Sequence, residues 1–183
     1  NEVELKFGES VAVVGCGGVG LNLIQAAALK SACPIYAIDN NITKRELCFT
    51  AGASIFTNSI NAVDEKVDVI IDTTGIPEVI SECVSKLSGK GRMVLVGQPA
   101  PGKMVEVMNA VNLFSGMGQT IKATQGGRTN PTEDIPRYVR MHQEGILDVK
   151  QFVTHRFKLD QVNEAFDLLR SGNAGRIIIE IGV

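Results

Sequence analysis

The sequence predicts an α/β fold, a doubly wound parallel sheet that forms the middle of three layers. Short apolar runs rich in β-branched residues alternate along the chain with segments of helical periodicity. The segments that join these runs have about the length that crossovers between parallel strands need. A glycine-rich turn also leads from the first run straight into a helix. This alternation favours a parallel sheet with right-handed connections.

The glycine-rich turn has the spacing Gly-x-Gly-x-x-Gly. A strand is predicted over residues 10–14, followed by Gly15, Gly17 and Gly20 and by a helix that continues to residue 30. Gly15 permits a tight turn, Gly17 lets the backbone approach a phosphate, and Gly20 lets the helix pack closely on the sheet. The helix directs its free N–H groups and the positive end of its dipole at an anion. The pattern therefore predicts a Rossmann fold that binds a dinucleotide at this turn.

An acid ends the second predicted strand, residues 33–39. The carboxylate of Asp39 can accept hydrogen bonds from the adenosine ribose hydroxyls of NAD, and it would repel the 2′-phosphate of NADP. The alternative is that Asp39 only caps the loop into the next helix. Because strand, glycine turn, helix, strand and acid come in the required order, the NAD-binding interpretation is favoured.

The remaining elements of the sheet continue the alternation. The fourth strand is nearly all apolar and β-branched, which is typical of a strand covered on both faces. Pro77 suits the first turn of the helix that follows it. The elements expected after Asp39 are a helix over 43–51, a strand over 53–57, a loop or single helical turn over 58–65, a strand over 67–75, a helix over 78–87, a strand over 91–97, a helix or irregular segment over 105–114 and a strand over 118–124.

Ligands of such sheets bind beyond the carboxyl ends of the strands, where the strand order reverses. The glycine turn, the acid and the ends of the fourth and fifth strands should therefore line one crevice. The candidate cofactor-binding residues from these segments are Gly15, Gly17, Gly18, Val19, Gly20, Asp39, Thr73, Gly75, Gly97 and Gln98.

The pattern changes near residue 126, so we expect a dinucleotide-binding domain over 1–126 and a C-terminal helix–strand segment over 127–183. A polar link is followed by predicted helices and strands in alternation. The last helix carries an apolar stripe at Val162, Ala165, Phe166 and Leu169. The elements expected in this segment are a helix over 132–144, a strand over 152–157, a helix over 160–170 and a strand over 176–181.

Composition argues against several classes of function. The net charge is −2, and no basic stripe indicates a nucleic acid or a membrane surface as partner. No apolar stretch approaches the length of about 18 residues that a membrane span needs. The four cysteines form no C-x-x-C pair and have no metal-ligand spacing with His142 or His155, so we expect free thiols in a reducing cytoplasm and no metal site. Cys16 is expected to fill the tight turn rather than to act as a nucleophile.

Over its whole length the chain resembles the zinc-type, medium-chain alcohol dehydrogenases. The shared features are the glycine turn with its Gly-Val pair, the second strand and its helix, the fifth strand and the closing segment. They lie at residues 15–21, 38–47, 51–53, 94–99, 153–155 and 163–172.

The resemblance implies roles for individual residues. Asp39 would hold the adenosine ribose, with Lys44 beside it. Residues 17–19 would offer backbone N–H groups to the pyrophosphate, which Arg176 would also contact. Residues 97–98 would place backbone groups near the nicotinamide. For Lys44 and Arg176, the alternative is a solvated surface charge.

In that family the zinc, its ligands and the proton relay belong to a barrel-like domain that precedes the Rossmann fold. This chain, which opens on Asn1, does not contain that domain, so we expect a fragment. The resemblance implies NAD as the cofactor and an alcohol or carbonyl compound as substrate of the full-length protein, with zinc only in the missing domain and no catalytic residue here. We expect the isolated chain to bind NAD(H) without turnover, and its C-terminal segment to expose apolar surface.

Two other functions use the same signals. A non-catalytic NAD(H)-sensing module would need the same glycine turn. An S-adenosylmethionine-dependent methyltransferase also has a glycine turn and an acid after its second strand, because it too binds an adenosine ribose. A homodimer through the sheet edge, around residues 118–123, is expected from the resemblance and from the tendency of unpaired edges to find partners.

Overall fold

Six parallel strands form the central sheet, in the order β3-β2-β1-β4-β5-β6. The computed structural model describes residues 2–107 and 118–182. The order reverses between β1 and β4, which is the arrangement predicted from the sequence. The strands are β1 (Val11–Val14), β2 (Ile35–Ile38), β3 (Ile55–Thr57), β4 (Val67–Asp72), β5 (Leu87–Leu95) and β6 (Thr120–Ala123).

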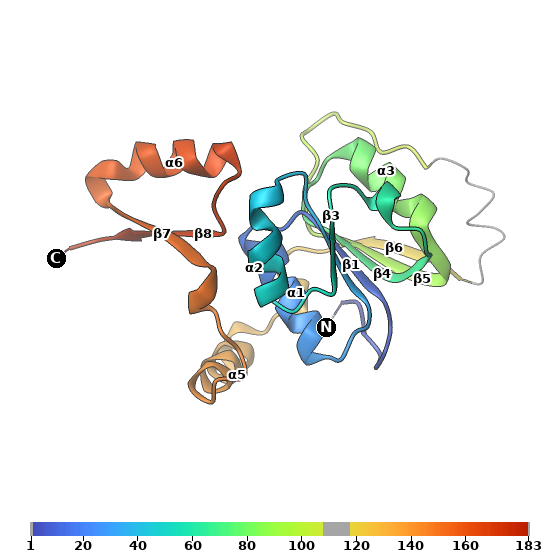
Figure 1. The fold of residues 1–183 in the computed structure, drawn as a ribbon, viewed down its shortest axis with the longest axis horizontal. Helices are drawn as coiled ribbons and strands as arrows, with labels where there is room; N and C mark the ends of the chain where they lie inside the picture. The colour runs from blue at the N-terminus through green and yellow to red at the C-terminus, as the bar shows by residue number, and fades with distance from the viewer. Residues whose placement is uncertain (1, 108–117, 183) are drawn as a thin grey trace.

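Helices cover both faces of this sheet and complete the three predicted layers (Figure 1). The helices are α1 (Gly18–Leu29), α2 (Arg45–Thr50) and α3 (Pro77–Lys86). Alternate residues of β1 belong to two separate cores. Val11 and Val13 pack with α1 and α2, whereas Ala12 and Val14 pack with α3. Because both faces of β1 are buried, the strand is apolar throughout rather than alternating.

The largest difference from the expected boundaries is at the start of β5. β5 begins at Leu87 instead of residue 91, because Leu87 is buried and pairs with Val67 before the register shifts and Arg92 pairs with Val69. The extra residues form an irregularity with exposed positions, which looks like a loop in the sequence. The expected element over 105–114 lies mostly outside the described residues, and residues 105–107 have no regular structure.

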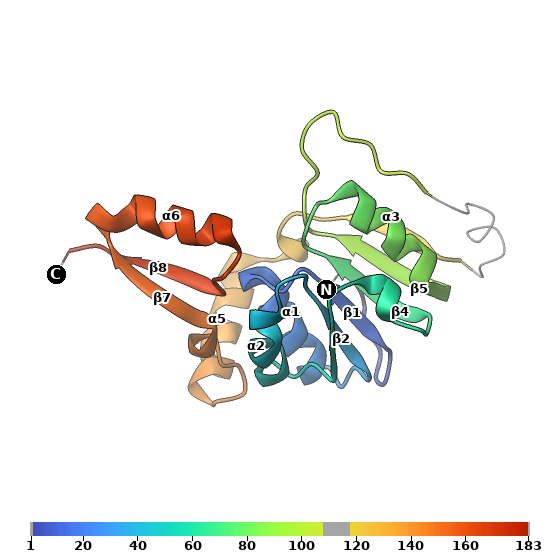
Figure 2. The ribbon, with the colours of Figure 1, turned by 45° about the horizontal axis from the view of Figure 1, so that its top comes forward.

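The C-terminal segment forms a second, two-stranded parallel sheet. Its elements are α5 (Pro131–Gln143), β7 (Val153–Lys158), α6 (Val162–Ser171) and β8 (Arg176–Glu180), close to the predicted ranges. β7 pairs with β8, and α6 lies over them, to one side of the six-stranded sheet (Figure 2). The predicted domain boundary at residue 126 falls between β6 and α5. In the described residues, no helix combines the length and the apolar character needed to span a membrane.

Phe152 packs the C-terminal segment against α1. Its side chain is 1% exposed and belongs to the core that contains Leu21 and Ile24 of α1. Nearby, the Gln25 side chain donates a hydrogen bond to the carbonyl of Asp148 at 3.1 Å. One aromatic side chain thus provides the main apolar anchor between the C-terminal segment and α1.

The apolar stripe of α6 is largely uncovered. Ala165 is buried, but Phe166 is 50% exposed and Leu169 is 56% exposed. Ile181, after β8, is 75% exposed. This agrees with the expected apolar surface on the C-terminal segment.

Replacing Phe152 by Ala should lower the free energy of unfolding by about 3–5 kcal/mol, because it opens a cavity in a closed core. Urea unfolding followed by circular dichroism measures this. Phe166→Ala is the matched control, since half of that side chain is already in solvent, and it should cost much less. Equal losses for the two variants would show that Phe152 does not anchor the segment.

Candidate functional site

The glycine turn joins β1 to α1 at the carboxyl edge of the sheet. Gly15 has φ +88°, and a Cβ there would lie 2.4 Å from the Thr73 hydroxyl oxygen. A Cβ on Gly20 would lie 1.9 Å from the Gly15 carbonyl oxygen, so a side chain there would force α1 away from the turn. A Cβ on Gly17 would meet no atom within 4 Å. The backbone at Gly17 therefore faces open space, where a phosphate could approach the start of α1.

The ends of β4 and β5 support the glycine turn from the other side. The Thr73 hydroxyl lies 3.0 Å from the Val14 carbonyl oxygen and 2.8 Å from that of Gly15. A Cβ on Gly97 would lie 2.2 Å from the Gly75 nitrogen, so residues 73–75 and 97–98 abut as predicted. Thr73 thus holds the turn in place from its carbonyl side.

Asp72 was not among the site residues predicted from the sequence. It organises the turn that follows β4, at residues 72–75. Its carboxylate is fully buried and accepts hydrogen bonds from the Thr74 hydroxyl at 2.6 Å and from the Gly75 N–H at 3.0 Å. The order Asp-Thr-Thr-Gly could have indicated this role of Asp72, because an Asp side chain in a turn commonly accepts hydrogen bonds from the N–H groups just after it.

Asp39 lies at the end of β2 with its carboxylate directed at the glycine turn. It accepts the Cys16 N–H at 2.7 Å and the Lys44 ammonium at 3.1 Å on one oxygen, and the Asn41 N–H at 2.9 Å on the other. The Asp39 and Lys44 side chains are 7% and 11% exposed, which excludes the alternative of a solvated charge for Lys44. The second oxygen of Asp39 keeps capacity for a further donor, such as a ribose hydroxyl.

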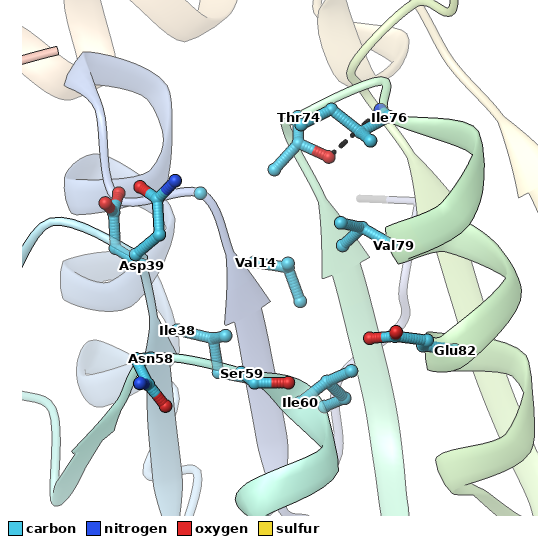
Figure 3. A pocket seen from close by; sticks show the side chains of 12 residues that line it. Val14, Ile38, Asp39, Asn58, Ser59, Ile60, Thr74, Ile76, Val79 and Glu82 are labelled. Atoms are coloured by element: carbon cyan, nitrogen blue, oxygen red, sulfur yellow. Dashed lines mark hydrogen bonds between the residues drawn. The ribbon is translucent and has the colours of Figure 1, made fainter.

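A hollow opens beside Asp39, between β1, β2 and α3 (Figure 3). Val14 and Ile38 form its floor. Residues 58–60 border one side, and Ile76, Val79 and Glu82 border the other. An apolar floor with polar groups at the rim suits a flat heteroaromatic base next to a ribose.

The C-terminal segment returns to the glycine turn and adds a cation. A Cβ on Gly18 would lie 3.4 Å from Arg176 Nε, so the guanidinium lies beside the first turn of α1. Asn41, also unselected from sequence, donates through its side-chain amide to the Gly172 carbonyl at 3.2 Å and to Asn173 Oδ1 at 2.8 Å. The site is therefore built from both parts of the chain.

Two buried thiols, those of Cys16 and Cys83, are held protonated. The pKa of Cys16 is raised by its hydrogen bond with Cys48 and by burial. Burial, with the nearby charges of Asp72 and Glu82, raises the pKa of Cys83 to about 12. These thiols are neutral at neutral pH, which agrees with a packing role for Cys16. Within residues 2–107 and 118–182, no three His, Cys, Asp or Glu side chains gather as a metal-binding group.

Comparisons with known proteins place this geometry in context. The sequence profile of the zinc-binding dehydrogenases matches residues 18–144. S-(hydroxymethyl)glutathione dehydrogenase of Photobacterium damsela subsp. piscicida is 32% identical over 193 residues, covering 98% of this chain and 51% of the relative. The protein of that name from Saccharomyces cerevisiae is 29% identical, covering 96% and 49%.

Solved structures agree. Benzyl alcohol dehydrogenase of Acinetobacter calcoaceticus superimposes with a TM-score of 0.92 at 28% identity, covering 100% of this chain and 52% of that one. The chain thus spans about half the length of the relatives it matches.

Proposed function

This chain belongs to the zinc-binding dehydrogenase family, and from that premise we propose that it is the NAD(H)-binding part of an alcohol dehydrogenase-like oxidoreductase. The observation that carries the proposal is the position of the Asp39 carboxylate next to a glycine turn whose outer side is open at Gly17. The hollow for a base adjoins the same carboxylate. We also propose a cytoplasmic location, since all four cysteines are free thiols.

The residues fit a dinucleotide in one orientation. The base would enter the hollow, and Asp39 would accept the hydroxyls of the adjacent ribose. The pyrophosphate would lie at the start of α1, where N–H groups, the helix dipole and Arg176 all favour an anion. Val19, which is 49% exposed, would offer its backbone N–H to the pyrophosphate, and residues 97–98 would border the nicotinamide.

This placement implies that the chain binds the cofactor, whereas the alcohol is activated by groups that are not among its site residues. When bound, the dinucleotide would supply a hydride acceptor in its nicotinamide ring. Zinc, which the family name implies, would supply Lewis-acid activation of the alcohol oxygen, and none of the site residues assigned here would hold it. The residues of this chain would bind and orient the cofactor, so the isolated chain should bind it without turning over an alcohol.

Titration of the purified 183-residue chain with NADH and with NADPH tests the proposal. We expect saturable binding by calorimetry that favours NADH, and no alcohol-dependent rise in NADH absorbance when NAD⁺, zinc and alcohol are supplied. Alcohol-dependent NADH formation would contradict the proposal that the isolated chain binds the cofactor without turning over an alcohol. Binding of S-adenosylhomocysteine in place of either dinucleotide would instead support a methyltransferase.

Asp39→Ala should weaken NADH binding by about 1.5–3 kcal/mol, the usual worth of a hydrogen bond to a charged group, and should improve relative NADPH binding. Asp39→Asn separates charge from hydrogen bonding, because the amide still accepts one N–H. Dissociation constants for both cofactors measure the change. An unaltered preference between NADH and NADPH would remove Asp39 from the site.

We further propose a homodimer through β6, which is one of the two edge strands of the sheet. Its Ile121 side chain is 40% exposed, and an edge strand presents backbone groups with which a second copy can pair. Light scattering should give a dimer mass that falls to a monomer mass for Ile121→Lys. Ile55→Lys is the matched control, since Ile55 lies on the opposite edge strand and is 41% exposed. A monomeric unsubstituted chain at high concentration would contradict this proposal.

A further inference from the structure

A second carboxylate faces the hollow beside Asp39, and the proposed function leaves it without a role. Glu82 projects from α3 toward the space above Val14 and Ile38 (Figure 3). It follows Val79 by three residues in α3, so these two side chains lie on one face of the helix, and Ile76 stands at the N-cap of the same helix. The wall of the hollow is thus apolar near the start of α3 and anionic one turn further on.

The Glu82 carboxylate is available to a ligand. Among the described residues it takes part in none of the ion pairs, and the hydrogen bond recorded for Glu82 involves its backbone carbonyl, which accepts from Ser85. An ionised carboxylate is an acceptor only, with room for several donors. A ligand that fills the hollow therefore gains most by presenting an N–H group toward α3.

Bases differ at the atom that would meet this carboxylate. Adenine carries an exocyclic amino group, which donates hydrogen bonds, whereas hypoxanthine and guanine carry a carbonyl oxygen at the same ring position. A carboxylate attracts the amino group and repels the oxygen. Across the hollow, the Ser59 hydroxyl oxygen accepts the Asn61 N–H at 3.1 Å, which leaves its own hydrogen for an acceptor on the base.

We propose that Glu82 determines base specificity by accepting a hydrogen bond from the exocyclic amino group of adenine. This inference rests on the proposed function, since it assumes that a dinucleotide binds with its base in the hollow. Two carboxylates then recognise two parts of the ligand. Asp39 recognises the ribose, and Glu82 recognises the base attached to it. The chain then selects against dinucleotides whose base carries an oxygen in place of the amino group.

Calorimetric titration with NAD⁺ and with nicotinamide hypoxanthine dinucleotide, which differ in that one group, tests the inference. The unsubstituted chain should bind NAD⁺ more tightly by a factor of about ten or more, as expected for a hydrogen bond to a charged group. In Glu82→Gln the preference should collapse, because the amide can donate to the oxygen of hypoxanthine as well as accept from adenine. A merely structural role for Glu82 would weaken both ligands equally.

Glu78→Gln is the matched control, since it removes the same charge from an exposed position in the first turn of α3. It should keep the preference of the unsubstituted chain. Equal binding of the two dinucleotides by the unsubstituted chain, or an undiminished preference in Glu82→Gln, overturns the role of Glu82 and leaves the NAD site standing. Failure of both dinucleotides to bind overturns the proposed function and this inference together.

Discussion

The buried carboxylate of Asp39 is the group on which the arrangement at the carboxyl edge of the sheet depends. It accepts the Cys16 N–H at 2.7 Å and the Lys44 ammonium at 3.1 Å. A charge removed from water is costly unless it is paired and hydrogen-bonded. Satisfying this one carboxylate therefore fixes the end of β2 against the glycine turn. Asn41, whose N–H it also accepts, carries the connection on to the loop between α6 and β8.

Much of the fold could be predicted from the sequence, because the strands of a doubly covered sheet are apolar on both faces. The runs at β1 and β4 are recognisable for that reason, and the glycine turn between β1 and α1 indicates the order of elements. The start of β5 was less predictable, since Leu87 joins the sheet only through its pairing with Val67. Pairing across strands is a tertiary property that a single run of residues does not reveal.

The candidate site likewise has features that the sequence predicts and features that only the structure reveals. The glycine spacing and Asp39 follow from local sequence order, and the structure brings them together with residues 73–75 and 97–98. The burial of Lys44 could not be foreseen, because a lysine in a loop looks the same in sequence whether it is solvated or paired. Glu82 was missed because α3 also carries Glu78, and only the packing of α3 decides which of these two acids meets the hollow.

Gly20 and Gly17 should be retained during evolution for different reasons. A methyl group on Gly20 would collide with the Gly15 carbonyl, so this glycine is required for α1 to pack whether or not a dinucleotide is ever bound. A methyl group on Gly17 would meet no protein atom, and its φ of −78° is open to any residue. In a descendant that bound no dinucleotide, Gly20 would still be required for packing, whereas Gly17 could be replaced. Gly17 is therefore the position whose retention among descendants would report use of the proposed dinucleotide site.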